Sequence, residues 1–189
     1  MKLAYDRGIR KCGCSTWVTS NRLNTRRNCS SIWRGTWTKW PQKGVSAHLE
    51  GFLCREFGRK AGKALRPVME EHYRLAYVRK PEFMGNTREE ERDRAYRVVK
   101  DLPWSRREIQ ERLTDYREDF RRGRAVGFTC GCRSRDAYYQ LVQYPVQAAA
   151  EMNKKMLYAQ LARHGEAGWN LSDMAYDSIV ALTRRYNEA

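Results

Sequence analysis

Acidic residues are nearly absent from the first quarter of this 189-residue sequence. Residues 1–49 hold ten Lys and Arg residues and one acid, Asp6, whereas the whole chain has 37 basic and 22 acidic residues. Long apolar runs are also missing, because the longest uncharged run, 137–150, is shorter than a membrane-spanning helix requires and includes three Gln and a Pro. We therefore expect no transmembrane segment, and an N-terminal segment whose charge is typical of a binder of anionic partners.

Motifs of catalysis and nucleotide binding are missing as well. The chain has three histidines, His48, His72 and His164, and no His-Glu-x-x-His, Gly-x-Ser-x-Gly, Walker-type or Gly-x-Gly-x-x-Gly sequence. The carboxylate clusters at 70–71 and 89–91 alternate with Arg, a pattern typical of a solvated helix face. The sequence therefore predicts that the chain is not an enzyme, with no catalytic residue and no small-molecule substrate.

No strand-like alternation of any length occurs, and the apolar residues recur at helical spacing instead. With 41% apolar residues the chain can bury a core, which excludes wholesale disorder. The predicted fold is all-α: an irregular helical bundle of about five or six helices with a long, mostly irregular basic N-terminal extension. We divide the chain into this extension, residues 1–44, and a helical body, residues 45–189.

Three helices are predicted in the first half of the body. Ser46 is a candidate N-cap for the first, and Pro67 is expected to interrupt the apolar pattern and start a second helix that ends before Pro81. The pair Asn86-Thr87, followed by glutamates, predicts the start of a third helix that ends before Pro103.

The strongest local signal is the segment Trp104-Ser105-Arg106-Arg107-Glu108-Ile109. Ser105 and Glu108 have the spacing of a capping box, and Trp104 and Ile109 occupy the two positions of a hydrophobic staple. An apolar stripe follows, and Gly123 is a natural C-terminal stop. The pattern predicts a helix over residues 105–122.

The last part of the chain predicts further helical segments. Residues 137–144 form a short helical or extended piece that Pro145 breaks, and a helix follows over 146–164, closed by Gly165. Ser172 is the expected N-cap of a final amphipathic helix.

Two copies of the tripeptide Cys-Gly-Cys lie more than a hundred residues apart, at Cys12-Gly13-Cys14 and Cys130-Gly131-Cys132. Disulfides between them would tie the extension to the body in an oxidising compartment. Four thiolates would also suit a structural zinc ion, although zinc sites usually space their cysteines by two to four residues. Free thiols packed as small apolar groups are the third interpretation. The spacing leaves all three open, so no cofactor is certain and structural zinc is the one candidate.

Tryptophan is concentrated in the basic extension. Trp33, Trp37 and Trp40 would share one side of a helix, beside Arg34 and Lys39. Such a group suits stacking on nucleic-acid bases, anchoring at a membrane interface or in a groove on a partner protein, or packing on the chain's own helices. The predicted partner-binding residues are Trp17, Arg26, Arg27, Trp33, Arg34, Trp37, Lys39 and Trp40.

The extension's Arg-, Ser- and Thr-rich composition resembles a mitochondrial targeting region. The functional hypothesis is a non-catalytic accessory subunit of a large mitochondrial assembly, a respiratory-chain or ATP-synthase complex, located peripherally at the membrane. Its partners would be other protein subunits, with contact to an anionic lipid surface. The alternative is an RNA-binding component of an organelle ribosome, whose basic extension follows the RNA.

Overall fold

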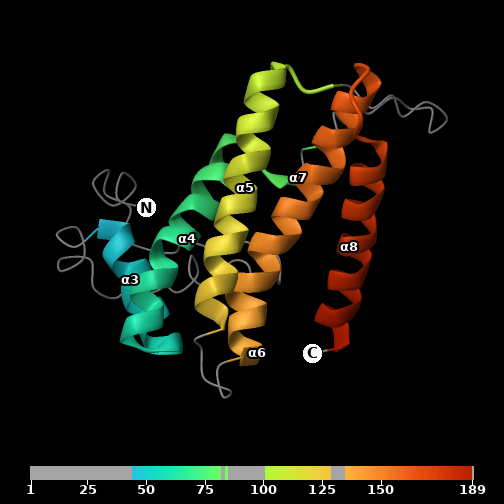
Figure 1. Cartoon of the computed structure of the whole chain (residues 1–189). Coiled ribbons are helices and arrows are strands. Elements are labelled where there is room, and N and C mark those ends of the chain that lie inside the picture. Colours follow the sequence, from blue (N-terminus) through green and yellow to red (C-terminus); the bar gives the residue numbers. More distant parts are fainter. Residues whose placement is uncertain (1–43, 82–83, 85–100, 129–134, 189) are drawn as a thin grey trace, which may run out of the picture.

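The computed structural model describes residues 44–81, 84, 101–128 and 135–188, and all regular secondary structure in these ranges is helical (Figure 1). The predicted all-α fold is confirmed for this part of the chain. The extension up to residue 43 and the helix predicted after Asn86 lie outside the described residues.

The first two helices meet at a glycine. Helix α3 spans Gly44–Phe57 and α4 spans Arg59–Val78. Gly58 between them has φ 84°, a left-handed conformation that glycine adopts without a steric cost. The prediction of a break at Pro67 was wrong, because α4 continues through this exposed proline. The chain turns at the residue that permits a positive φ instead.

Helix α5, Arg106–Gly127, begins as its sequence predicts. The Ser105 Oγ accepts a hydrogen bond from the Glu108 backbone N–H (3.3 Å), and the Ser105 N–H donates to the Glu108 carboxylate (2.7 Å). The predicted end was wrong, since Gly123 lies inside the helix and is buried there. Its missing side chain leaves room for Val68, whose Cγ1 lies 3.3 Å from where a Cβ would stand, and its carbonyl accepts from the Tyr138 hydroxyl (2.7 Å).

Pro145 does not break the chain's next helical segment. Helix α6, Arg135–Tyr138, continues through a π-helical turn, η4, Tyr139–Gln143, into α7, Tyr144–Arg163. The prediction of a separate piece ending at Pro145 was wrong. The wide turn, in which the Tyr144 N–H donates to the Tyr139 carbonyl, places the proline in the first turn of α7, where its missing N–H costs little.

Helix α8, Trp169–Glu188, starts three residues before the predicted cap. Ser172 is buried inside the helix, and its hydroxyl donates to the Lys155 carbonyl of α7 (2.8 Å). Ser172 therefore joins two helices and does not cap one. Gly168, just before α8, packs against the Tyr158 carbonyl so closely that an added Cβ would lie 2.5 Å from it.

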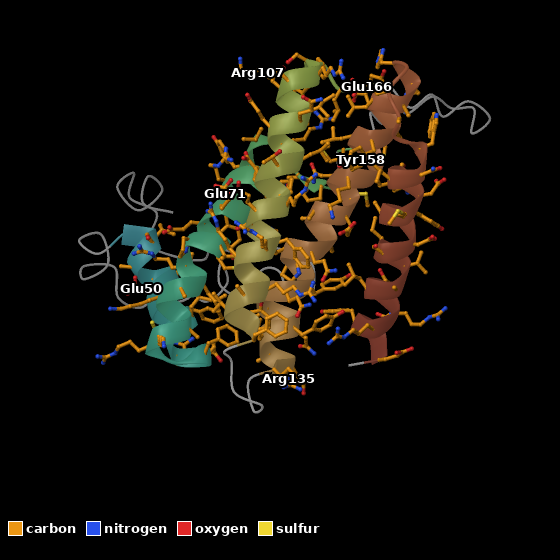
Figure 2. All side chains as sticks on the ribbon, viewed as in Figure 1. Glu50, Glu71, Arg107, Arg135, Tyr158 and Glu166 are labelled. Atoms are coloured by element: carbon orange, nitrogen blue, oxygen red, sulfur yellow. The ribbon has the colours of Figure 1, made fainter. Side chains whose placement is uncertain are left out.

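The described helices form a row in chain order, in which α3 packs on α4, α4 on α5, α5 on α7 and α7 on α8 (Figure 1). One core cluster joins α3, α4, α6, η4 and α7, a second joins α5 and α7, and a small third one joins α4, α5 and α7. At one end, an ion pair between Arg106 and Glu166 (2.6 Å) links the start of α5 to the turn before α8; Figure 2 shows Arg107 and Glu166 at this end and Arg135 at the other. None of the described helices has the length and apolar character needed to span a membrane.

Candidate functional site

The inner face of α5 carries two buried charged residues. Arg112 is 6% exposed and Asp119 is 1% exposed, on a face whose other members are mostly apolar or aromatic. Residues seven apart lie on the same side of a helix, so both side chains enter the region between α4, α5 and α7, on either side of Tyr116. Buried charges are rare unless their polar groups are bonded, so these two residues mark a candidate functional site. We call the region between α4, α5 and α7 around Arg112, Tyr116 and Asp119 the seam.

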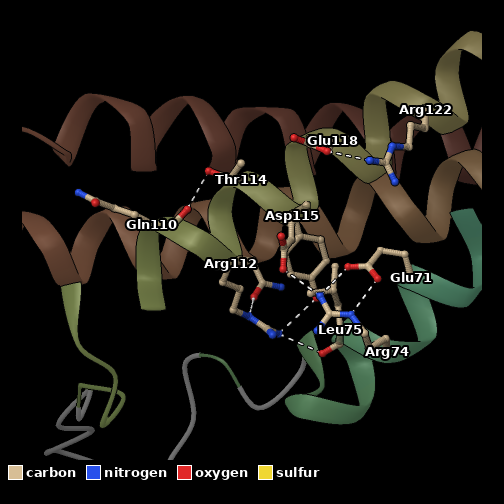
Figure 3. A network of polar contacts seen from close by, with 11 residues as sticks. Glu71, Arg74, Leu75, Gln110, Arg112, Thr114, Asp115, Glu118 and Arg122 are labelled. Carbon is tan, nitrogen blue, oxygen red and sulfur yellow. Dashed lines mark hydrogen bonds and ion pairs between the residues drawn. The ribbon is translucent and has the colours of Figure 1, made fainter. Parts of the chain in front are cut away.

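The Arg112 guanidinium is bonded to neutral groups from two other helices (Figure 3). Its Nε donates to the Asn153 side-chain oxygen of α7 (2.9 Å), and its Nη2 donates to the carbonyls of Leu75 (3.3 Å) and Arg79 (2.9 Å) at the end of α4. These carbonyls lie at the negative end of the α4 dipole, which stabilises a cation. Arg112 therefore caps α4 and forms no ion pair with any described residue.

Aromatic rings complete the environment of this guanidinium. The Arg112 side chain lies 4.9 Å from the Trp104 ring centroid and 5.1 Å from that of Tyr116, distances typical of cation–π contacts. Its partner Asn153 is fully buried and donates to the Ala149 carbonyl within α7 (2.8 Å). Burial lowers the pKa of Arg112 from its usual value, yet the surrounding acceptors match a charged guanidinium. Arg112 thus joins α4, α5 and α7.

The outer edge of the seam is an ion-pair cluster between α4 and α5 (Figure 3). Arg74 holds both carboxylate oxygens of Glu71, at 2.8 and 2.6 Å, and donates to Asp115 on α5 at 2.8 Å. The hydrogen bonds from Arg74 hold the pKa of Glu71 below its usual value. Because Arg74 is about half exposed, this cluster adds little stability and chiefly sets how α4 lies on α5.

Asp119 differs from every other acid of the seam. Neither of its carboxylate oxygens has a hydrogen-bond partner among the described residues. Burial, with a smaller effect from the Glu71 charge, raises the pKa of Asp119 to about 7, and Arg122 opposes that rise. A carboxyl group with this pKa can hold a proton near neutral pH, as a general acid does. At 1% exposure, however, it cannot reach a substrate as the helices stand.

A shallow polar pocket lies on the other side of α4. It has a volume of about 430 Å³ and is lined by Ser46, Ala47, Glu50, Gly51, Cys54 and Arg66. Arg66 forms an ion pair with Glu50 (3.0 Å), and the Ser46 hydroxyl donates to Glu70. The Ser46, Glu50 and Arg66 side chains are thus each bonded to a neighbouring side chain, although the Arg66 Nε has no hydrogen-bond partner among the described residues.

The site residues predicted from the sequence all lie outside the described ranges. This holds for the four cysteines of the Cys-Gly-Cys pairs, Cys12, Cys14, Cys130 and Cys132, and for the tryptophans and basic residues of the extension. The disulfide, zinc and partner-binding assignments thus stay predictions. Cys54, which is described, is a free thiol whose Sγ donates to the Arg59 carbonyl (3.7 Å). The described residues bring together no group of three or more potential metal ligands.

Sequence reasoning missed Arg112 and Asp119, although a signal was present. The sequence predicts an apolar stripe of Ile109, Leu113, Tyr116 and Phe120, and positions 112 and 119 fall on the same face at helical spacing. A charged residue in the middle of an apolar stripe predicts a buried polar contact. The frequent alternation of Arg with acidic residues, which is typical of a solvated helix face, hides this signal.

Comparison with solved structures finds an extensive likeness to a carbohydrate-active enzyme. The similar protein is described as a novel family GH115 4-O-methyl-α-glucuronidase, BtGH115A, with specificity for decorated arabinogalactans. The two are 50% identical in sequence with a TM-score of 0.79, over 87% of this chain and 22% of that one. The chain therefore spans about a fifth of that protein's length. No protein-family model matches the chain, and no curated protein matches it.

This similarity contradicts the function predicted from the sequence. The mitochondrial accessory subunit and the organelle ribosomal component are both wrong, as are the prediction that the chain is not an enzyme and the mitochondrial, peripheral-membrane location. Basic charge and clustered tryptophan are typical of binding surfaces in general, so they do not distinguish a mitochondrial complex or a ribosome from another kind of partner. Short sequence motifs do not identify enzymes such as this glucuronidase, because glycosidases require two carboxylates that the fold brings together.

Proposed function

We propose that this chain forms the helical unit of a glycoside hydrolase of the GH115 type, acting on polysaccharide decorated with 4-O-methyl-glucuronic acid. The observation that carries the proposal is the 50% identity to BtGH115A over 87% of the chain. Since the likeness spans 22% of that enzyme, substrate binding and hydrolysis belong to the whole protein, and the helical unit is one part of it.

The seam suits a unit that must hold its shape within a larger enzyme. Arg112 bonds to groups of α4 and α7 at once, so these helices cannot slide past α5 without leaving a buried cation unbonded. Active sites require neighbouring elements held to within fractions of an ångström, and a rigid helical unit supplies such support. The proposed role is therefore to complete and position the enzyme.

A hybrid enzyme tests this proposal. The segment of BtGH115A that matches this chain is replaced by the corresponding segment of this chain, and release of 4-O-methyl-glucuronic acid from decorated arabinogalactan is measured. We expect the hybrid to fold and to keep activity within about tenfold of BtGH115A, a change of about 1.4 kcal/mol in transition-state stabilisation.

Two controls define the meaning of the result. One lacks the matched segment, and the other carries an unrelated helical bundle of similar length in its place. Both should lose activity if the segment has a specific role. A folded hybrid that is no more active than these controls would contradict the proposal.

A further inference from the structure

Helix α8 has an apolar strip that stays about half exposed in the described part of the chain. Trp169, Tyr176 and Val180 are 54%, 51% and 44% exposed. They are seven and four residues apart, so they line up on one side of the helix over about 16 Å. We call these three residues the α8 strip.

The strip results from the position of α8 at the edge of the helix row (Figure 1). The side of α8 that carries Ser172, Ala175 and Leu182 is buried, and its main packing partner is α7. The Tyr139 hydroxyl also donates to the Leu182 carbonyl (3.3 Å), and Tyr144 stacks on Tyr186 with ring centroids 4.2 Å apart. These contacts fix α8 on its inner side and leave the strip about half exposed along its flank.

We propose that the α8 strip is the surface on which the remainder of a GH115-type enzyme docks, an inference that rests on the proposed function. Tryptophan and tyrosine are the residue types that contribute most to protein interfaces, and contiguous exposed apolar side chains mark such interfaces. About four fifths of BtGH115A lies beyond the part that this chain matches, which supplies a protein partner of the required size.

The charges beside the strip favour a protein face over other occupants. Asp173 and Asp177 are exposed on α8 next to the strip, with the exposed Arg184 one turn beyond Val180, so the border of the strip is acidic along most of its length and would repel an anionic lipid surface or an acidic polysaccharide. In a symmetric pair of this chain the same two acids would approach their own copies. The Lys155 ammonium lies 4.8 Å from the Tyr176 ring centroid, on the α7 side. The fitting partner is thus an apolar protein face with basic groups opposite Asp173 and Asp177.

Oxidative footprinting tests the docking directly. The full 189-residue chain and the hybrid enzyme described above are exposed to equal doses of hydroxyl radicals, and side-chain oxidation is read by mass spectrometry. We expect Trp169 and Tyr176 to react at least fivefold more slowly in the hybrid. Tyr116, which is 1% exposed, gives the protected baseline in both. Equal reactivity of Trp169 and Tyr176 in an active hybrid would overturn the docking inference and leave the proposed function standing.

Variants extend the test to energetics. Trp169→Gln combined with Tyr176→Gln should leave the melting temperature of the isolated chain within about 2 °C, because both side chains are exposed, but should make the helical unit of the hybrid unfold separately from the rest. Met174→Gln, at a 64% exposed position on another side of α8, is the matched control. An equal effect of Met174→Gln would overturn the assignment of docking to the strip. If the isolated chain forms dimers and Trp169→Gln abolishes them, a second copy of the chain is the occupant of the strip. That result would also overturn the docking inference.

Discussion

Arg112 and Asp119 lie on the same buried face of α5, two helical turns apart, and neither forms an ion pair with a described residue. The two are not equivalent. Arg112 is bonded to an amide oxygen and two carbonyls, whereas the Asp119 carboxylate has no hydrogen-bond partner among the described residues. The charge of Arg112 is therefore compatible with the fold, and the charge of Asp119 opposes it.

Asp119 predicts a specific dependence of stability on pH. Its pKa is about 7 in the folded protein, while an unfolded aspartate has a pKa near 3.8. Between these values the folded state binds more protons than the unfolded state, so the free energy of unfolding falls as pH rises from about 4 to about 7. The loss is at most about 4 kcal/mol for a shift of this size, and it persists above pH 7.

Asp119→Asn should remove this pH dependence. We expect the variant to be more stable than the wild type at pH 8, by about 1–3 kcal/mol, with little gain at pH 4, as measured by urea unfolding. Glu118→Gln is the control, since Glu118 is about half exposed and pairs with Arg122. A wild-type slope retained in Asp119→Asn would show that this carboxyl is not the group that titrates.

Arg112→Met should destabilise the protein strongly. The substitution keeps an apolar stem but leaves the Asn153 oxygen and the Arg79 carbonyl without the donor that Arg112 supplies, which we expect to cost about 2–4 kcal/mol. The Leu75 carbonyl loses one of two donors, since it also accepts from the Arg79 N–H (3.2 Å). Arg107→Met on the same helix removes only an exposed i,i+4 pair with Glu111, and should leave the stability almost unchanged. Equal losses of the free energy of unfolding in the two variants would mean that the hydrogen bonds of Arg112 do not stabilise the packing of α4, α5 and α7.

Gly62 is required by the close packing of α3 on α4. A Cβ at this position would stand 2.4 Å from the Cys54 backbone nitrogen, so Gly62→Ala should force the helices apart and lower stability by about 1–3 kcal/mol. At Gly51, within α3, no heavy atom lies within 4 Å of the added Cβ. Gly51→Ala should therefore raise stability by about 0.5–1 kcal/mol. Thermal unfolding of the two variants in opposite directions would verify the helix contact.

Ser105→Ala should weaken the start of α5 by about 0.5–2 kcal/mol, because it removes the acceptor for the Glu108 N–H. Thr114→Ala is a suitable control within the same helix, since its hydroxyl only donates to the Gln110 carbonyl of the preceding turn. An unchanged thermal midpoint in Ser105→Ala would contradict the role of the capping box.

Features that depend on local chemistry were predictable from the sequence. The Ser105–Glu108 box places a side-chain acceptor opposite a backbone donor regardless of the rest of the fold, and the structure confirms it. The helix breaks predicted at two prolines were wrong. Pro67 is exposed within α4, and a π-helical turn accommodates Pro145, so tertiary packing outweighed the local penalty at both.

The candidate site was less predictable, because it depends on contacts distant in sequence. Nothing local to Arg112 indicates that Leu75, Arg79 and Asn153 will surround it, and nothing local to Asp119 indicates that it lacks a donor. The proposed enzyme class was not predictable for a related reason. The two catalytic carboxylates of a glycosidase are brought together by the whole enzyme fold, so the sequence of one helical unit need not contain a short motif that identifies the reaction.

The most direct test of the proposed function is the rate at which the hybrid enzyme releases 4-O-methyl-glucuronic acid from decorated arabinogalactan. If this chain is the helical unit of such an enzyme, kcat/KM of the hybrid should lie within about tenfold of that of BtGH115A, while the enzyme with an unrelated bundle in its place is at least a hundredfold less active. A well-folded hybrid with no more activity than the unrelated-bundle control would contradict the proposal.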